Sequence, residues 1–190
     1  MKNFKRLKIS RIFVILTLLA IFILISAISY VDAVSNNISD SVFRLHVIAN
    51  SDSEEDQTLK LKVRDNLLEY MNTIAKDSTN KEEAMRIASE HKNEFIQIAE
   101  KTIRENGYEY TVNIQIGKSD FPTKYYGDIT LPAGEYDALK VEIGEAKGKN
   151  WWCVMFPPLC FVDVSTGVVP DDSKQELKQK LKNEEYNLIS

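Results

Sequence analysis

The chain of 190 residues contains only two cysteines and two histidines. These few residues show none of the ligand spacings that are typical of zinc sites. The sequence also lacks the motifs H-E-x-x-H and G-x-S-x-G, the P-loop and the EF-hand loop. We therefore predict no catalytic residue set, no bound metal and no cofactor.

Acidic side chains are missing from the N-terminus. The first 31 residues hold five cations and no acid, and residues 12–31 hold no charged side chain. Twenty helical residues span about 30 Å, which is the thickness of a membrane's hydrocarbon core. A basic start, an apolar stretch and small residues also describe a secretory signal, with small-x-small cleavage sites after Ser29 and Ala33. The sequence predicts an export helix over residues 1–33, either cleaved or kept as an anchor.

The rest of the chain is acidic. Beyond residue 31 there are 19 basic and 28 acidic side chains, a net charge of −9. Nucleic-acid binding requires clustered Lys and Arg, so this charge argues against a nucleic-acid partner. It also argues against adhesion to an anionic lipid surface. Because the basic end stays in the cytoplasm, everything after Asp32 is expected to be exported, with membrane contact only through the N-terminal segment.

A polar linker is expected over residues 34–41, followed by one domain over residues 42–190. Alternation of apolar and polar residues predicts strands over residues 42–49 and 108–116. Further strands are expected over residues 129–131, 136–143, 151–156 and 159–164. Apolar stripes predict a helix over residues 53–75 and a second one between the capping box at 79–82 and the stop at Asn106-Gly107. Another capping box, at residues 173–176, opens a C-terminal helix. We predict a two-layer α+β domain, with a mainly antiparallel sheet and helices on one face.

The most unusual composition is W-W-C-V-M-F-P-P-L-C-F at residues 151–161. Its simpler interpretation is a buried sheet core. The functional interpretation is a proline-stiffened surface for a partner, since aromatic residues carry much of the energy at interfaces. The partner-binding hypothesis names Trp151, Trp152, Phe156, Pro157 and Pro158. Strand alternation places Trp151 and Trp152 on opposite faces, so both interpretations can hold together.

The two cysteines lie in the same stretch. A hairpin centred between Phe156 and Pro157 places Cys153 opposite Cys160, near enough for a disulfide after modest adjustment. An exported location permits oxidation. The alternative is a reduced Cys153 that pairs with His46 or His91 as the nucleophile of a hydrolase.

A second hypothetical partner site lies at the end of the first strand, in R-L-H-V-I-A-N-S-D-S. Polar side chains at strand ends often bind ligands or partners, and those named here are Arg44, His46, Asn50, Ser51 and Asp52. The simpler interpretation is capping of the following helix by one of residues 51–53, with His46 as a core residue.

Four stretches carry a resemblance to a known family. They are R-L-H-V-I-A-N-S-D-S-E-E-D-Q-T-L-K-L-K-V-R-D (residues 44–65), F-P-T-K-Y-Y-G (121–127), P-A-G-E-Y (132–136) and N-W-W-C-V-M-F-P-P-L-C-F-V-D (150–163). In this order they resemble the stage II sporulation protein R family of endospore-forming bacteria.

The resemblance implies a signal between cells and no enzymatic activity. Family members are exported from the forespore into the intermembrane space between forespore and mother cell. There they activate a membrane-embedded aspartic protease of the mother-cell membrane, the sporulation sigma-E factor-processing peptidase, and so trigger pro-sigma-E processing. The runner-up hypothesis is a secreted cysteine hydrolase that acts on cell wall or peptide.

Cleavage at the N-terminus gives the first test. If a signal peptidase cuts at the small-x-small sites, the mature protein begins at Tyr30 or Val34. Mass spectrometry of the exported protein measures this directly. A mature chain that keeps residues 12–31 would contradict cleavage and identify the segment as a membrane anchor.

Overall fold

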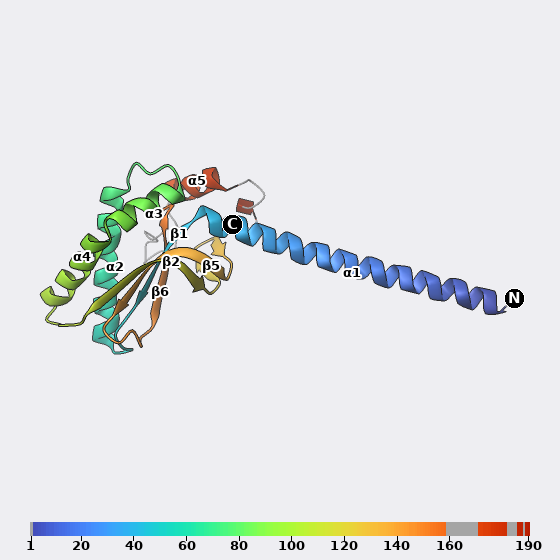
Figure 1. Ribbon diagram of the computed structural model, residues 1–190, viewed down its shortest axis with the longest axis horizontal. Helices are drawn as coiled ribbons and strands as arrows, with labels where there is room; N and C mark the ends of the chain where they lie inside the picture. The colour runs from blue at the N-terminus through green and yellow to red at the C-terminus, as the bar shows by residue number, and fades with distance from the viewer. Residues whose placement is uncertain (1, 159–170, 182–185, 188) are drawn as a thin grey trace. The chain divides into compact units, whose positions relative to one another are not determined.

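The computed structural model of the chain describes residues 2–158, 171–181, 186–187 and 189–190 (Figure 1). It divides into two compact units, Met1–Asn36 and Asn37–Ser190. The boundary falls inside the first helix, α1 (Lys2–Ser41).

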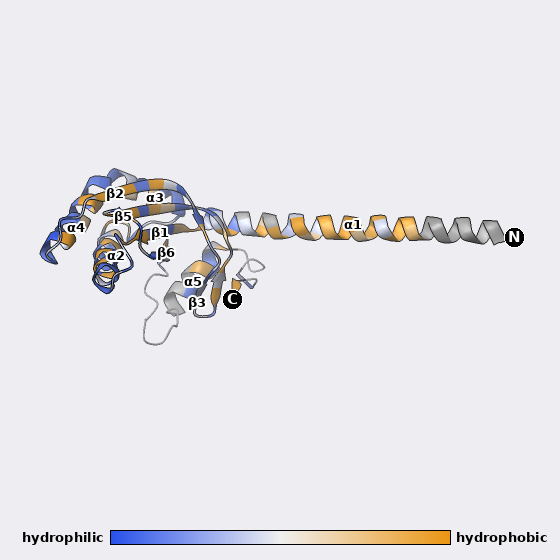
Figure 2. Ribbon diagram, turned by 90° about the horizontal axis from the view of Figure 1, so that it is seen from below, coloured by the Kyte–Doolittle hydropathy of each residue, from blue (hydrophilic) through white to orange (hydrophobic). Residues whose placement is uncertain are grey.

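Helix α1 contains the stretch Phe13–Ser41, which is long and apolar enough to cross a membrane by length and composition. Its large apolar side chains are exposed, and Figure 2 shows apolar residues along much of the helix. These features are compatible with a signal peptide or a membrane anchor. Residues 34–41, which the sequence analysis expected to be a polar linker, continue the helix. Ile38 belongs to the second unit and is buried, so packing overrides the local polar composition there.

The main sheet has four strands in the order β2-β5-β1-β6. They are β1 (Phe43–Ile48), β2 (Val112–Phe121), β5 (Gly134–Ile143) and β6 (Asn150–Phe156). Strand β1 is parallel to β5, whereas β1–β6 and β2–β5 are antiparallel pairs. Strands β3 (Lys124–Tyr126) and β4 (Ile129–Leu131) form a separate antiparallel pair. The predicted α+β class with a mainly antiparallel sheet is confirmed.

Helices α2 (Glu54–Ile74), α3 (Lys81–Glu90) and α4 (Lys92–Glu105) pack against the sheet, and α2 and α4 lie side by side (Figure 1). A further helix, α5 (Asp171–Lys180), lies near the C-terminus. The core between helices and sheet is made of fully buried apolar side chains, whose removal from water is the main favourable term in folding. They include Phe43, Leu45, Val47, Leu139, Val141, Val63, Leu67, Phe95, Ala99 and Ile103.

The second predicted helix is two helices in the structure. The chain turns at His91, where φ is −100° and ψ is 21°, outside the α-helical region. Helical hydrogen bonds continue on both sides of this turn, from His91 N to Ile87 O and from Phe95 N to His91 O. The apolar side chains of α3 and α4 therefore stay on one side. The N-cap is Asn80 and not Thr79, because the Asn80 side chain accepts from Glu83 N.

The strand predicted over residues 108–116 lies further along the chain. Strand β2 begins at Val112 and continues to Phe121, five residues beyond the predicted end of the strand at residue 116. Residues 119–121 pair with residues 134–136 of β5. This pairing outweighs the low strand preference of Gly117 and of the polar residues that follow it. The strand predicted over residues 159–164 lies outside the described residues.

A charged cluster joins the helical layer to the sheet. Asp137 of β5 accepts from Lys81 Nζ of α3 at 2.7 Å and from Lys118 Nζ of β2 at 3.3 Å. Lys81 and Asp137 are both buried. Burial alone raises the pKa of the Asp137 carboxyl, but the two lysines outweigh it and hold this pKa below its ordinary value.

Replacement of Asp137 by Asn removes the closer anion of the buried Lys81 ammonium and leaves only the exposed Glu82 carboxylate, 3.9 Å away. We expect the free energy of unfolding to fall by about 3 kcal/mol at pH 7, measured by urea denaturation. Because the folded pKa is lowered, the carboxylate stabilises the fold above about pH 4 and loses this effect as the pH falls through the folded pKa. The difference between wild type and Asp137→Asn therefore shrinks in acid.

Asp65→Asn is the matched control, because the Asp65 side chain is 60% exposed and its one ion pair among the described residues is with its neighbour Arg64. It should change stability by less than about 0.5 kcal/mol. A constant difference between wild type and Asp137→Asn from pH 2 to pH 7 would contradict the assignment.

Candidate functional site

The sheet face turned away from α2, α3 and α4 is called the distal face here. On β1 it carries Arg44 and His46, because Phe43, Leu45 and Val47 face the helices. The register places Trp152 of β6 and Lys140 of β5 beside His46. Arg44 is fully buried and His46 is 5% exposed, so β1 is buried on both faces.

Arg44 lies in a cage of aromatic rings. Its guanidinium carbon is 4.0 Å from the ring centroid of Phe121 and 4.6 Å from that of Tyr136, and Nη2 donates to Tyr126 Oη at 2.7 Å. The ring faces attract the cation electrostatically. Nε and Nη1 are buried without a hydrogen-bond partner, and the ion pairs of the described residues do not include Arg44. Burial lowers the pKa of Arg44, and the hydroxyl groups of Tyr126 and Tyr136 offset part of this effect.

Tyr126 connects the β3–β4 hairpin to the sheet. Its hydroxyl group accepts from Arg44 and donates to Trp152 O at 3.2 Å. Tyr136 Oη donates to Pro132 O at 2.7 Å, beyond the other end of the hairpin. The neighbouring Tyr125 points the other way and is 75% exposed. The buried guanidinium therefore helps to hold the β3–β4 hairpin in place, together with the burial of Ile129 and Leu131.

His46 stacks on Trp152, with ring centroids 3.7 Å apart and an angle of 24° between the planes. Phe121 lies 4.8 Å from the Trp152 ring. His46 Nε2 donates to Asn150 Oδ1 at 2.6 Å, and burial lowers the pKa of His46, so the ring is neutral at pH 7. Trp152 is half-buried, which makes it the accessible end of an otherwise buried stack.

This stack joins all four stretches on which the family resemblance rests. Arg44 comes from the first stretch, Phe121 and Tyr126 from the second, Tyr136 from the third and Trp152 from the fourth. These positions are distant in sequence, and Arg44 and Tyr126 are 82 residues apart. The resemblance therefore follows one spatial cluster.

The polar side chains of residues 50–52, predicted as a partner site, make hydrogen bonds mainly to other residues of the domain. Asn50 Nδ2 and Ser51 Oγ donate to Asp56 Oδ2 at 2.8 and 2.6 Å, and Asp52 Oδ1 accepts from Lys149 N at 2.7 Å. Ser53 is the N-cap of α2. These bonds agree with the capping interpretation of this segment.

Asp56 was missed by the sequence analysis. Its side chain is 4% exposed, and its Oδ2 accepts the hydrogen bonds from Asn50 Nδ2 and Ser51 Oγ. Burial alone raises its pKa, but hydrogen bonds from Ser51, Asn50 and Tyr110 hold it below the ordinary value. The available signal was the pattern S-x-x-D at Ser53, a capping-box variant that opens α2.

The turn between β5 and β6 packs against the segment that joins β1 to α2. Asn50 Oδ1 accepts from Glu145 N at 3.0 Å, and Gly148 N donates to Ala49 O at 2.9 Å. A Cβ at Gly148 would lie 2.1 Å from Ser51 O. Glycine is required there, because any side chain would collide with backbone that cannot move away.

Trp151 and Cys153, on either side of Trp152 in β6, face the helices. Trp151 lies under Arg64 of α2, with the guanidinium carbon 4.2 Å from the ring centroid. Cys153, paired with Leu45, is 2% exposed and disulfide-bonded. Cys160, the partner named in the sequence analysis, lies outside the described residues. Cys153 therefore has no thiol to offer, and its side chain lies on the opposite sheet face from His46.

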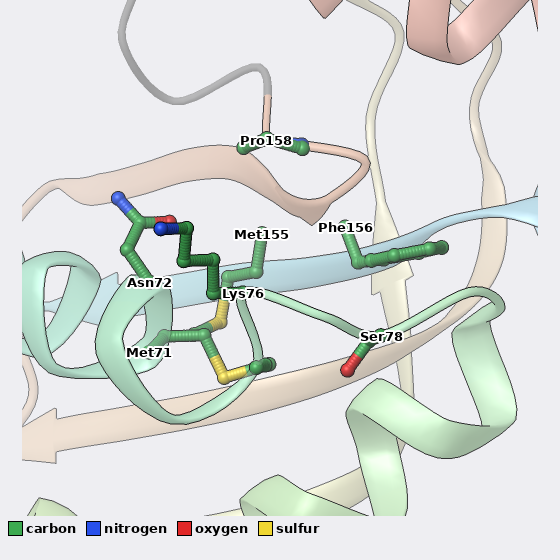
Figure 3. Close-up of a pocket in the computed structure, with 8 residues that line it drawn as sticks. Met71, Asn72, Lys76, Ser78, Met155, Phe156 and Pro158 are labelled. Carbon is green, nitrogen blue, oxygen red and sulfur yellow. The ribbon is translucent and has the colours of Figure 1, made fainter.

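The end of β6 lines a pocket of about 360 Å³ (Figure 3). The pairing of β6 with β1 shifts by one residue between Phe43 and Arg44, so Phe43 pairs with Phe156 while Arg44 pairs with Val154. This irregularity turns Phe156 from the distal face toward the helical side. Phe156 and Pro158, both named in the partner-binding hypothesis, line the pocket, and Pro157 is buried beside them.

These features define a class of protein, a small α+β domain that follows one apolar N-terminal helix. Among the described residues, no three His, Cys, Asp or Glu side chains are grouped so that they could hold a metal ion. The chain belongs to the stage II sporulation protein R family, whose model matches residues 39–166. The sequence-based assignment to this family is confirmed.

The chain is similar to the stage II sporulation protein R of Bacillus subtilis (strain 168). The two are 42% identical over 144 residues, which cover 75% of this chain and 64% of the relative. The match thus spans less than two thirds of the relative's length. No solved structure matches the chain.

Tyr126→Phe tests the role of the buried hydroxyl group. The variant loses the bonds to Arg44 Nη2 and Trp152 O, so we expect the free energy of unfolding to fall by about 2 kcal/mol in urea denaturation. Tyr125→Phe is the matched control, because that ring is largely exposed, and it should change stability by less than about 0.5 kcal/mol. Equal effects of the two substitutions would refute the proposed link between hairpin and sheet.

Proposed function

We propose that this sporulation protein is a secreted signal between cells. Exported from the forespore into the space between forespore and mother cell, it activates a membrane-embedded aspartic protease in the mother-cell membrane, the sporulation sigma-E factor-processing peptidase. Activation triggers pro-sigma-E processing. The observation that carries this proposal is membership of the stage II sporulation protein R family.

Other features are compatible with export and signalling. The apolar helix α1 suits a signal peptide or an anchor, and the part beyond residue 31 carries the net charge of −9 expected to keep it off anionic lipid. The disulfide at Cys153 suits an oxidising compartment.

The distal face supplies a surface for the protease. Trp152 is half-buried and rests on His46 and Phe121, so little side-chain freedom remains to be lost on binding. A rigid aromatic side chain with one accessible side is typical of interface hot spots. Binding activates the protease by favouring the conformation or dimer that cleaves, a shift in population that needs no chemistry from this chain.

The cysteine hydrolase is not supported by the arrangement of its proposed residues. A nucleophilic cysteine needs a thiolate within hydrogen-bond reach of a base. Cys153 is disulfide-bonded, and His46 projects from the other face of the sheet. His91 is bonded through Nδ1 to Tyr70 Oη at 2.9 Å.

Trp152 and its neighbour Trp151 give a matched test. Both are half-buried tryptophans on one strand, but they lie on opposite faces. We expect Trp152→Ala to reduce pro-sigma-E processing per amount of folded protein, because loss of a hot spot of about 2 kcal/mol weakens binding roughly 30-fold. The measurement is immunoblotting of precursor and product in sporulating cells.

Trp151→Ala is the control. It loses the stacking on Arg64 and should lower stability, yet the folded fraction should support normal processing. If both variants process pro-sigma-E equally well per folded molecule, the distal face is not the contact. If a deletion strain still processes pro-sigma-E, the signalling function itself is wrong.

A further inference from the structure

The pocket at the end of β6 has a size suited to a few side chains. Its volume of about 360 Å³ lies at the lower end of the range for ligand pockets, roughly 300–1,000 Å³. It opens between the last turn of α2 and the end of β6 (Figure 3). It is separate from the distal face, because Trp152 does not line it.

The inner part of the pocket is apolar and adaptable. Met71 of α2 and Met155 and Phe156 of β6 line it, and each is at most 5% exposed. Methionine side chains are unbranched and polarisable, so they adjust to side chains of different shape and are common at peptide-binding surfaces. The inner part therefore suits one apolar side chain of a partner.

The rim has a positive charge and an unsatisfied hydroxyl group. Lys76 is exposed. Among the described residues that line the pocket it is the one charged side chain, and the ion pairs of the described residues do not include it. Ser78 Oγ is buried without a hydrogen-bond partner. Lys76 makes this rim locally positive in a domain that is otherwise acidic, so the rim attracts a carboxylate through Lys76 alone, with Ser78 available to donate to an oxygen of the bound segment.

We propose that this pocket binds an extended segment of the partner protein in which an apolar side chain stands next to Asp or Glu. The apolar side chain enters between Met71 and Met155, and the carboxylate meets Lys76. The identity of the partner as the protease rests on the proposed function. The chemistry of the pocket, an apolar group beside an anion, rests on the residues described above.

A purely structural role of Lys76 makes a different prediction. Lys76 follows the C-terminal end of α2, where a cation interacts favourably with the helix dipole. In that case Lys76→Glu lowers the melting temperature and changes no binding reaction. The test therefore measures binding and stability separately.

The probe is a capped octapeptide with a central Leu-Asp pair, and its matched control carries Leu-Asn. The full-length chain, in lipid nanodiscs and labelled at its four methionine methyl groups, reports binding by NMR. We expect the Leu-Asp peptide to shift the signals of Met71 and Met155 while Met85 of α3 stays unchanged. The Leu-Asn peptide should bind about tenfold more weakly, and Lys76→Glu should reverse this preference.

Lys92→Glu is the control variant, because Lys92 is an exposed lysine at the start of α4 that does not line the pocket. It should bind both peptides like wild type. Unchanged Met71 and Met155 signals, equal affinity for the two peptides or an unaltered preference in Lys76→Glu would each overturn the proposal.

Processing in sporulating cells distinguishes the two proposals. We expect Lys76→Glu to reduce pro-sigma-E processing at least several-fold per folded molecule, while Lys92→Glu does not. If a deletion abolishes processing but Lys76→Glu supports it fully, the signalling function stands and the pocket is not the protease site. If the deletion has no effect, the function fails whatever the peptides bind.

Discussion

The domain depends on a cation that is enclosed by its own core. Arg44 lies near the middle of the sheet on β1, fully buried, with aromatic rings where a carboxylate would be expected. Desolvation of a charge is expensive, and the rings and one phenolic oxygen return only part of that free energy. Such a group is weak evidence for stability. Its consequence is specificity, because the guanidinium gains its full set of contacts only in the arrangement that places Phe121, Tyr126 and Tyr136 around it.

The contacts around Arg44 join the β3–β4 hairpin to the main sheet. The β3–β4 hairpin is not part of the main sheet, so its position depends on tertiary contacts. The Tyr126 hydroxyl group provides two of them, one to Arg44 and one to the backbone of Trp152. At the opposite end of β1, the Asn50–Asp56 hydrogen bond and the glycine turn before β6 fix the entry to α2. Strand β1 is thus held at both ends by polar side chains that bond within the domain, although Nε and Nη1 of Arg44 have no hydrogen-bond partner.

Sequence periodicity predicted the features that depend on one face of one element. The stripe of Leu59, Val63 and Leu67 predicted α2, and alternation predicted that Trp151 and Trp152 lie on opposite faces of β6. It failed where a partner element decides the outcome. Asp120 and Phe121 extend β2 because β5 lies beside them, and His91 divides a helix whose apolar stripe continues unbroken. Burial of Arg44 was equally hidden, since a charged residue in an alternating strand normally indicates a solvent-facing side.

The irregular pairing near Phe43 has the largest consequence for the proposed contacts. With regular alternation Phe156 would share the distal face with Trp152 and Val154, and all three would form one patch. The shift by one residue turns Phe156 toward α2 and so creates the pocket wall. Trp152 and Phe156 remain on one strand, four residues or about 13 Å apart at the usual rise. A partner that engages both surfaces must therefore reach around the edge of β6, presenting one surface to the tryptophan and an extended segment to the pocket.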